Sequence, residues 1–184
     1  MFLMGRALAF RECSLQALVL MTNHVHLIIT PFTEEALPRF VKRVAQRYAQ
    51  TRNQRRLGSG RLFEERYFSD PLISTVELSI VTAYIELNPV RAGIVSSPEE
   101  YRWSTYALHA GGERSEVSPG LWTPSSWYLS LDGDPERRAA RYRAWVDECR
   151  AAGTRPTCTD ARMLAMAPPG DRRRLERPNR KSAA

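Results

Sequence analysis

The segment "LQALVLMTNHVHLIITP", residues 15–31, consists of two apolar runs that Thr22 and Asn23 separate. β-Branched residues fill the second run, and asparagine tolerates the positive φ that a two-residue hairpin turn needs. The pattern therefore predicts two antiparallel strands joined by a tight turn. Because helices are predicted elsewhere along the chain, this hairpin indicates an α+β fold with an antiparallel sheet flanked by helices.

Two of the three histidines of the chain lie in this hairpin. Because alternate residues of a strand face the same way, His24 and His26 should share one face and Val25 should take the other. Neutral imidazole is a common metal ligand, so the pair indicates a metal site that needs a third ligand from elsewhere. The alternative, two imidazoles on a solvent-facing strand, stays open because such a short pattern arises easily by chance.

Two helices are predicted after the hairpin. Residues 34–56 carry apolar side chains at helical spacing, and residues 74–88 do so behind a capping box formed by Ser74 and Glu77. Pro89 should end the second helix, because the residue before a proline avoids the α conformation. The buried stripe of this helix is expected at Val76, Ile80, Ala83 and Leu87.

The remaining segments give weaker patterns. Residues 2–14 indicate the end of a helix, residues 61–73 a short strand and a turn, and the aromatic motif "YRWSTYAL" should pack on the core. Residues 109–134 have a linker-like composition, and residues 135–184 form a basic extension with a predicted short helix and then a disordered tail. We therefore expect one folded domain over residues 1–108.

The net charge of +7 is unevenly distributed. Residues 1–134 contain 14 Lys and Arg against 14 Asp and Glu, whereas residues 135–184 contain 13 against 6. Inside the neutral part, the first predicted helix has a run of basic residues without an acid: Arg39, Lys42, Arg43, Arg47, Arg52, Arg55 and Arg56. Such a patch indicates a polyanionic partner, with a solvated helix face as the alternative.

The composition excludes several classes of protein. A stretch of about 18 apolar residues is absent, which excludes a transmembrane helix, and Arg6 with its charged neighbours interrupts any secretion signal. The cysteines Cys13, Cys149 and Cys158 lack metal-ligand spacing and indicate free thiols in a reducing cytoplasm. We therefore expect a cytoplasmic protein that does not contact a membrane.

Tyr84 and Asn88 lie four residues apart and therefore on one face of the second helix. The side-chain oxygen of Asn88 can serve as a metal ligand beside the histidine pair. Taken alone, Asn88 is also an ordinary residue before a proline, and Tyr84 an ordinary half-buried aromatic residue. The spacing by itself leaves these alternatives open.

Three motifs in this order and spacing resemble those of the REP-associated tyrosine transposases: "LVLMTNHVHLIITP", "YIELNPVRAGIV" and "YRWSTY". This family is in the single-tyrosine branch of the HUH endonucleases, and the resemblance implies a ferredoxin-like HUH fold over residues 1–108. It also implies that His24 and His26 match the metal-binding pair, that Asn88 matches the position completing the metal site, and that Tyr84 matches the nucleophile.

The resemblance implies DNA transposition chemistry on single-stranded DNA folded into a hairpin. A divalent cation, Mg²⁺ or Mn²⁺, would act as a Lewis acid on the scissile phosphate, and Tyr84 would attack the phosphorus to leave a 5′-phosphotyrosine link. The basic helix face from Arg39 to Arg56, the basic tail and Arg91 are the expected DNA contacts. We therefore expect a DNA endonuclease and strand transferase. Its expected location is the cytoplasm of a bacterial-type cell, in association with the nucleoid, and a homodimer is a possible assembly.

One element of the family has no counterpart in this sequence. Family members begin with a further strand that would lie beside the histidine strand, and this chain starts too late for it, so we expect a sheet with an unpaired edge. Either the true start lies upstream, or the protein is a non-catalytic nucleic-acid-binding remnant of such a transposase. A metal-dependent phosphodiesterase that uses water is the third alternative, in which Tyr84 has no role.

Overall fold

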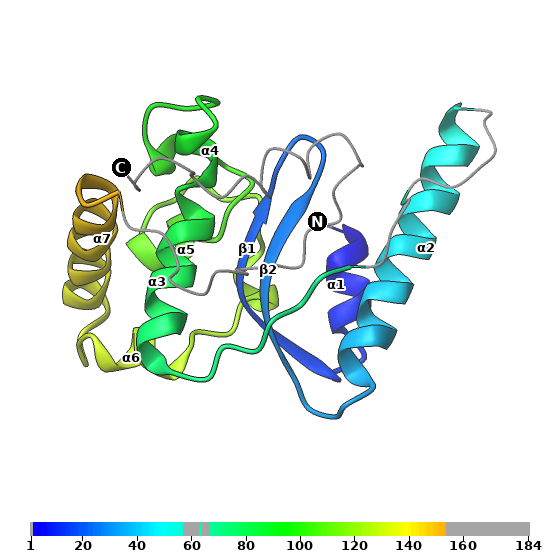
Figure 1. Cartoon of the computed structure of the whole chain (residues 1–184), viewed down its shortest axis with the longest axis horizontal. Coiled ribbons are helices and arrows are strands. Elements are labelled where there is room, and N and C mark those ends of the chain that lie inside the picture. Colours follow the sequence, from blue (N-terminus) through cyan, green and yellow to red (C-terminus); the bar gives the residue numbers. More distant parts are fainter. Residues whose placement is uncertain (1, 57–62, 64–66, 154–184) are drawn as a thin grey trace, which may run out of the picture.

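The computed structural model describes residues 2–56, 63 and 67–153 (Figure 1). Within these residues the protein is an α+β molecule, in which a two-stranded antiparallel sheet has helices on both faces. The predicted fold class is therefore confirmed, and the arrangement is consistent with a ferredoxin-like HUH fold. Across the same residues, no helix is long and apolar enough to cross a membrane.

The strands β1 (Cys13–Leu20) and β2 (Val25–Pro31) form the predicted hairpin. Leu20 pairs with Val25, which leaves the tight turn at the predicted residues 22–23. Buried side chains line both faces of the hairpin, because each face is covered by helices. The two faces therefore carry two separate apolar clusters.

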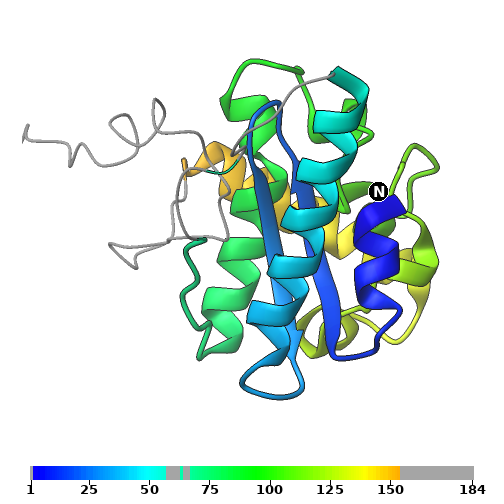
Figure 2. The same cartoon turned by 90° about the vertical axis from the view of Figure 1, so that its right-hand side faces the viewer.

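One face of the hairpin packs against α1 (Phe2–Leu8) and α2 (Ala36–Arg56). Figure 2 shows α2 lying along the hairpin with α1 beside it. The predicted apolar stripe of α2 explains this contact, since Phe40 and Val41 are buried together with Leu18 of β1.

The opposite face packs against α3 (Thr75–Glu86). The predicted capping box is present: Ser74 Oγ accepts the Glu77 N–H at 3.1 Å, and the Glu77 carboxylate accepts the Ser74 N–H at 3.2 Å. Such a box stabilises the first turn by pairing N–H groups that the helix itself leaves unpaired. The sequence therefore specifies where α3 begins.

The predicted buried stripe of α3 is only partly correct. Ala83 and Leu87 are buried, but Val76 is 66% exposed. The residues of α3 that face the sheet are Val81 and Ile85. Val76 precedes Val81 by five residues and therefore points about 140° away around the helix.

The end of α3 also differs from the prediction. α3 ends at Glu86, and a further short helical turn, α4 (Asn88–Arg91), follows directly. Pro89 lies in the first turn of α4, where its missing N–H costs nothing. The proline therefore starts a new turn in addition to ending the longer helix.

A third layer lies on the side of α3 that faces away from the sheet (Figure 1). It contains buried Tyr128 in the segment 109–134, whose composition is linker-like, and buried Tyr142 and Val146 in the helix predicted within the basic extension. The elements of this part of the chain are the 3₁₀ turns η1 (Pro98–Glu100) and η2 (Pro119–Leu121) and the helices α5 (Tyr106–Ala110), α6 (Ser126–Ser130) and α7 (Pro135–Ala151).

Irregular chain covers the outer edge of β1. The Leu20 N–H donates to the Trp103 carbonyl, and the Thr105 N–H donates to the Leu18 carbonyl, each at 2.9 Å. Tyr106 of the aromatic motif is buried and Tyr101 packs against the cluster beside α3, so these two rings pack on the core as predicted, whereas Trp103 is exposed. In the part of the chain that the structure describes, the sheet contains β1 and β2 alone, so neither of its outer edges pairs with a further strand.

Some predictions fall on parts of the chain outside the described residues. Of the strand expected in residues 61–73, the described residues 63 and 67–73 form no strand, and the others lie outside. The basic tail, residues 168–184, and Cys158 also lie outside the described residues. Cys13 and Cys149 are buried thiols.

Candidate active site and nucleic-acid interface

The histidine pair lies at the turn end of the hairpin, on the face that α3 covers. His26 pairs with Val19, and Val19 lies with Ile28 in the cluster that contacts α3. The Nε2 atoms of His24 and His26 are 3.0 Å apart, and the two rings meet edge to face. The two imidazoles therefore share one face, and their Nε2 atoms converge on one place.

The surroundings of the pair suit a divalent cation. Burial, reinforced by the neighbouring His24, lowers the pKa of His26 from 6.5 to about 3, so His26 is a neutral imidazole at physiological pH. The Nδ1 atom of His24 lies 2.7 Å from Asn23 Oδ1, a contact that orients the ring. Neighbouring ligands of an octahedral cation, each about 2.1 Å from the ion, are about 3 Å apart. The observed separation of the Nε2 atoms fits two ligands of one cation.

His26 also contains an unsatisfied polar atom. Its Nδ1 is buried and has no hydrogen-bond partner among the described residues. Native folds rarely leave a buried polar atom unpaired, and each such atom calls for an explanation, such as a catalytic role or a bound water or ion. This cost is consistent with a histidine kept in the strand for a purpose other than packing.

Tyr84 lies over the same face of the hairpin as the histidine pair. Val81 and Ile85 of α3 pack against Val19 and Ile28, and the half-buried Tyr84 packs against this cluster. In Figure 1, the junction of α3 and α4 lies at the same end of the molecule as the hairpin turn. The fold therefore brings the predicted nucleophile and the histidine pair to one side of the sheet and to one end of it.

Asn88 follows Tyr84 by one helical turn. Its Nδ2 donates to the Tyr84 carbonyl at 3.1 Å, which fixes the orientation of the amide, and its Oδ1 has the capacity to accept or to ligate. Within the described residues, no group of three or more His, Cys, Asp or Glu side chains is placed to hold a metal ion. Asn88 stays the predicted third ligand.

Arg91 contacts Tyr84 directly. Its guanidinium lies over the Tyr84 ring, 4.3 Å from the centroid, and it donates to the Tyr84 carbonyl at 3.0 Å. Arg91 is exposed, so a DNA phosphate can approach it. The sequence predicts Arg91 as a DNA contact but not its place against Tyr84, which depends on the extra turn α4.

The basic residues of α2 lie on the other side of the hairpin from Tyr84. Glu12 pairs with Arg43 at 2.6 Å and with Arg39 at 3.5 Å, and the hydrogen bond from Arg43 is the main cause that lowers the pKa of Glu12. Glu12 is far from the basic run in sequence, so the sequence alone does not show that an acid lies beside Arg39 and Arg43. The other predicted contacts with described side chains are Lys42, Arg47, Arg52 and Arg55, and the side chain of Arg56 lies outside the described set.

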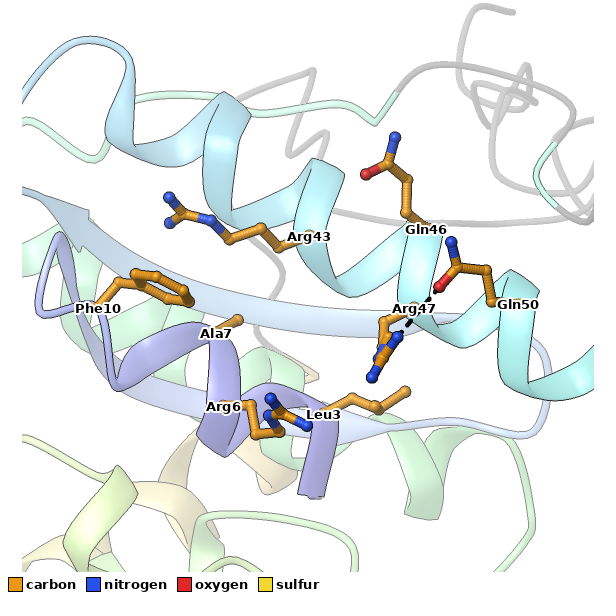
Figure 3. A pocket seen from close by; sticks show the side chains of 8 residues that line it. All are labelled: Leu3, Arg6, Ala7, Phe10, Arg43, Gln46, Arg47 and Gln50. Atoms are coloured by element: carbon orange, nitrogen blue, oxygen red, sulfur yellow. Dashed lines mark hydrogen bonds between the residues drawn. The ribbon is translucent and has the colours of Figure 1, made fainter.

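A basic pocket of about 260 Å³ opens between α1 and α2 (Figure 3). In it, the Arg43 guanidinium stacks on the Phe10 ring at 4.0 Å, and Arg47 donates to Gln50 at 3.4 Å. Guanidinium, aromatic and amide groups together suit a single nucleic-acid strand. The sequence predicts Arg43 and Arg47 here but not Arg6, because the pattern of the first helix is weak. The lining residues are Leu3, Arg6, Ala7, Phe10, Arg43, Gln46, Arg47 and Gln50.

Glu86, at the end of α3, has no role in the sequence patterns and is completely buried in the structure. It is the single charged residue between positions 78 and 90, and an isolated charge in an apolar stretch is the signal that points to it. Its hydrogen-bond partners lie at positions 105, 109 and 142, which no spacing within the helix predicts.

A comparison with known families matches the first part of the chain. Residues 3–88, slightly under half of the 184 residues, match the family model described as "Transposase IS200 like". The matched segment contains His24, His26, Tyr84 and Asn88. No curated protein and no solved structure matches the chain.

Proposed function

We propose, on the premise that residues 3–88 belong to the IS200-like transposase family, that this protein cuts and rejoins single-stranded DNA through a covalent bond to Tyr84. Transposases act on DNA, so the family supports DNA as the substrate class. The observation that carries the proposal is the convergence of the His24 and His26 Nε2 atoms on the sheet face over which Tyr84 lies.

Tyr84 is the proposed nucleophile. Its phenolic oxygen attacks the phosphorus, so that an oxygen–phosphorus bond to Tyr84 forms and the bond from phosphorus to the 3′-oxygen breaks. The upstream strand leaves with a 3′-hydroxyl, and the proton lost by the phenol balances the proton gained there. The downstream strand stays on Tyr84 through its 5′-phosphate. Because one phosphodiester replaces another, attack by a new 3′-hydroxyl reverses the step and joins two strands.

The histidine pair is the proposed holder of a divalent cation, Mg²⁺ or Mn²⁺, with Asn88 Oδ1 as the third protein ligand. When bound, such a cation supplies positive charge that polarises the scissile phosphate. His26 does not have to release an imidazolium proton for this role at neutral pH, because burial already keeps the ring uncharged. The contact with Asn23 holds the ring of His24 in place.

Arg91 is the proposed phosphate contact beside the nucleophile. The guanidinium stacked on the Tyr84 ring restricts rotation of that ring and holds a positive charge next to it. Charge that develops on the phosphate during attack is stabilised by a cation already in position. Arg91 therefore has two roles, one in orienting Tyr84 and one in binding the substrate.

The basic side of α2 and the pocket of Figure 3 are the proposed contacts for the rest of the substrate, a single strand folded into a hairpin. Contacts between guanidinium groups and phosphates give affinity and salt dependence without reading the base sequence. Because this surface lies across the sheet from Tyr84, a bound DNA has to span both sides of the molecule.

Replacement of Tyr84 by phenylalanine tests the proposed reaction. A hairpin oligonucleotide labelled at its 3′ end should become covalently attached to the wild-type protein with Mn²⁺ and should stay unattached with Tyr84→Phe, because the variant lacks the attacking oxygen. The Kd for the oligonucleotide should be unchanged. Tyr48→Phe is the matched control, because Tyr48 is a partly exposed tyrosine of α2 and also loses one hydroxyl. This control should form the adduct at the wild-type rate.

The same assay separates the alternatives. An adduct that persists in Tyr84→Phe contradicts the assignment of the nucleophile. Wild-type protein that cleaves the DNA without forming an adduct acts as a phosphodiesterase that uses water. Wild-type protein that binds a panel of hairpins but cleaves none of them with either metal is a non-catalytic nucleic-acid-binding remnant.

A further inference from the structure

Glu86 is a buried carboxylate that the proposed reaction does not use. It lies on the last turn of α3, two residues after Tyr84 and two before Asn88, and it is 0% exposed. A carboxylate withdrawn from water is stable only when other groups donate hydrogen bonds to it. Its partners therefore show what holds this end of α3.

Three donors from the later part of the chain surround the Glu86 carboxylate. Oε1 accepts from Thr105 Oγ1 at 2.6 Å and from His109 Nδ1 at 3.0 Å. Because a carboxylate can only accept, the proton of the second bond lies on Nδ1 of His109. Oε2 accepts from the Tyr142 hydroxyl at 2.5 Å. All three partners are themselves buried, at 1% exposure or less. The end of α3 is thus bound to α5 and α7 by hydrogen bonds that water does not reach.

Thr105 extends this contact to the hairpin. Its Oγ1 accepts the Leu18 N–H at 2.9 Å, and its own N–H donates to the Leu18 carbonyl at 2.9 Å. Leu18 lies in β1 and pairs with Leu27, which directly follows His26 in β2. One threonine therefore connects the helix of Tyr84 to the hairpin of the histidine pair.

Aromatic rings hold the donors in place around Glu86. The His109 ring stacks on Tyr142 with centroids 4.7 Å apart and meets Trp122 and Tyr128 edge to face at 4.9 Å. The Tyr128 hydroxyl donates to the His109 carbonyl at 2.8 Å. A donor fixed by packing positions its acceptor more strictly than a donor on a mobile surface side chain.

We propose that Glu86 is a positioning residue, which holds the end of α3, and with it Tyr84 and Asn88, in place relative to the histidine strand. Its three partners all lie beyond the matched segment 3–88, so the later part of the chain sets the geometry of the site. This inference rests on the proposed function. Attack in line with a leaving group tolerates little displacement, and a shift of about 1 Å costs on the order of a hundredfold in rate.

The variant Glu86→Gln tests this role. Glutamine keeps the size of the side chain but replaces one acceptor oxygen by an NH₂ group that faces a donor. Adduct formation at saturating hairpin DNA should slow by about tenfold or more, while the Kd for DNA stays unchanged. The affinity for Mn²⁺ without DNA, measured by electron paramagnetic resonance, should fall by roughly tenfold because Asn88 is displaced.

Val117→Ala is the control for a loss of stability alone. Val117 is 1% exposed and belongs to the cluster on the α1 and α2 side of the sheet. At a temperature where it is folded, this variant should keep the wild-type rate and Mn²⁺ affinity. Equal slowing in both variants at equal loss of stability overturns the proposal, as does a folded Glu86→Gln protein with wild-type rate and Mn²⁺ affinity.

Two further comparisons keep the test decisive. If the wild-type protein forms no adduct, the proposed function fails, and the Mn²⁺ affinities of wild type and Glu86→Gln still decide whether Glu86 positions the site. If Glu86→Gln does not fold, Tyr142→Phe removes one donor and keeps the ring. Its adduct formation should slow less but in the same direction, and an unchanged rate and Mn²⁺ affinity there overturn the proposal.

Discussion

Burial gives His26 an acid–base behaviour different from that of an exposed histidine. The desolvation of the ring and, to a smaller extent, the neighbouring His24 lower its pKa from 6.5 to about 3. A histidine that is neutral throughout the physiological range offers a lone pair to a cation without first releasing a proton. The same shift has a consequence for the stability of the metal-free protein.

The free energy of unfolding of the metal-free protein should decrease in acid. Between pH 6.5 and about 3, His26 binds a proton in the unfolded chain but not in the folded protein, so stability is complete above 6.5 and is lost as the pH falls. From pH 7.5 to pH 5 this one group accounts for about 2 kcal/mol. Urea unfolding in EDTA at both pH values measures the loss.

The variant His26→Gln is the reference for this pH dependence. It lacks the titrating group, so its free energy of unfolding should change less than that of the wild type between the two pH values. An equal change in both proteins would show that His26 is not the group responsible.

Among the elements, α2 presents less positive charge in the folded structure than its sequence indicates. Glu12 neutralises part of the charge of Arg39 and Arg43, whereas Arg47 points into the pocket beside Gln50. The positive electrostatic field at the N-terminal end of the basic run is therefore weaker than the sequence indicates. Phosphate contacts should depend more on the later arginines.

The variant Arg47→Gln tests α2 as a DNA contact. It should weaken the binding of hairpin oligonucleotides by a similar factor for unrelated sequences, and it should reduce the slope of log K against log salt concentration by about one. Arg114→Gln makes the same change of charge at an exposed position after α5 and should leave the slope unchanged. Equal effects of the two variants would mean that overall charge, and not this surface, binds the DNA.

The hairpin and the two long helices are predictable because their signals are local. The two apolar runs around the tight turn specify β1 and β2, and the capping box of Ser74 and Glu77 specifies the start of α3. The spacing of residues along a helix does not reveal which other element packs against each of its faces. This is why Val76, expected in the buried stripe, is exposed, and why Glu86 is buried without having been predicted.

Across the whole molecule, the sheet separates the two surfaces that we propose to be functional. The histidine pair and Tyr84 lie on the α3 side, and the basic residues of α2 lie on the other. The sequence predicts the members of both sets but cannot predict this separation, because it follows from which strand residues face which helix. The contribution of residues 109–151 to the core is likewise not visible in their polar composition.

The packing of α7 on the rest of the molecule leads to a prediction about stability. Val146 is completely buried in the cluster that also contains Ala83 and Leu87, so Val146→Ala should cost about 2 kcal/mol of unfolding free energy by leaving a cavity. Arg141→Ala, at an exposed position of the same helix, should cost far less. Urea unfolding followed by circular dichroism compares them. Equal small effects would show that α7 does not fold cooperatively with α3.

Peptide mapping of the covalent adduct shows directly whether Tyr84 is the residue that binds the DNA. Trypsin cleaves after Arg66 and Arg91, so one peptide, residues 67–91, contains Tyr84 together with Tyr67. Fragmentation of this peptide in a mass spectrometer locates the attached nucleotide. We expect a 5′-phosphate linked to the phenolic oxygen of Tyr84. A nucleotide on Tyr67, on any other residue or on none would contradict this expectation.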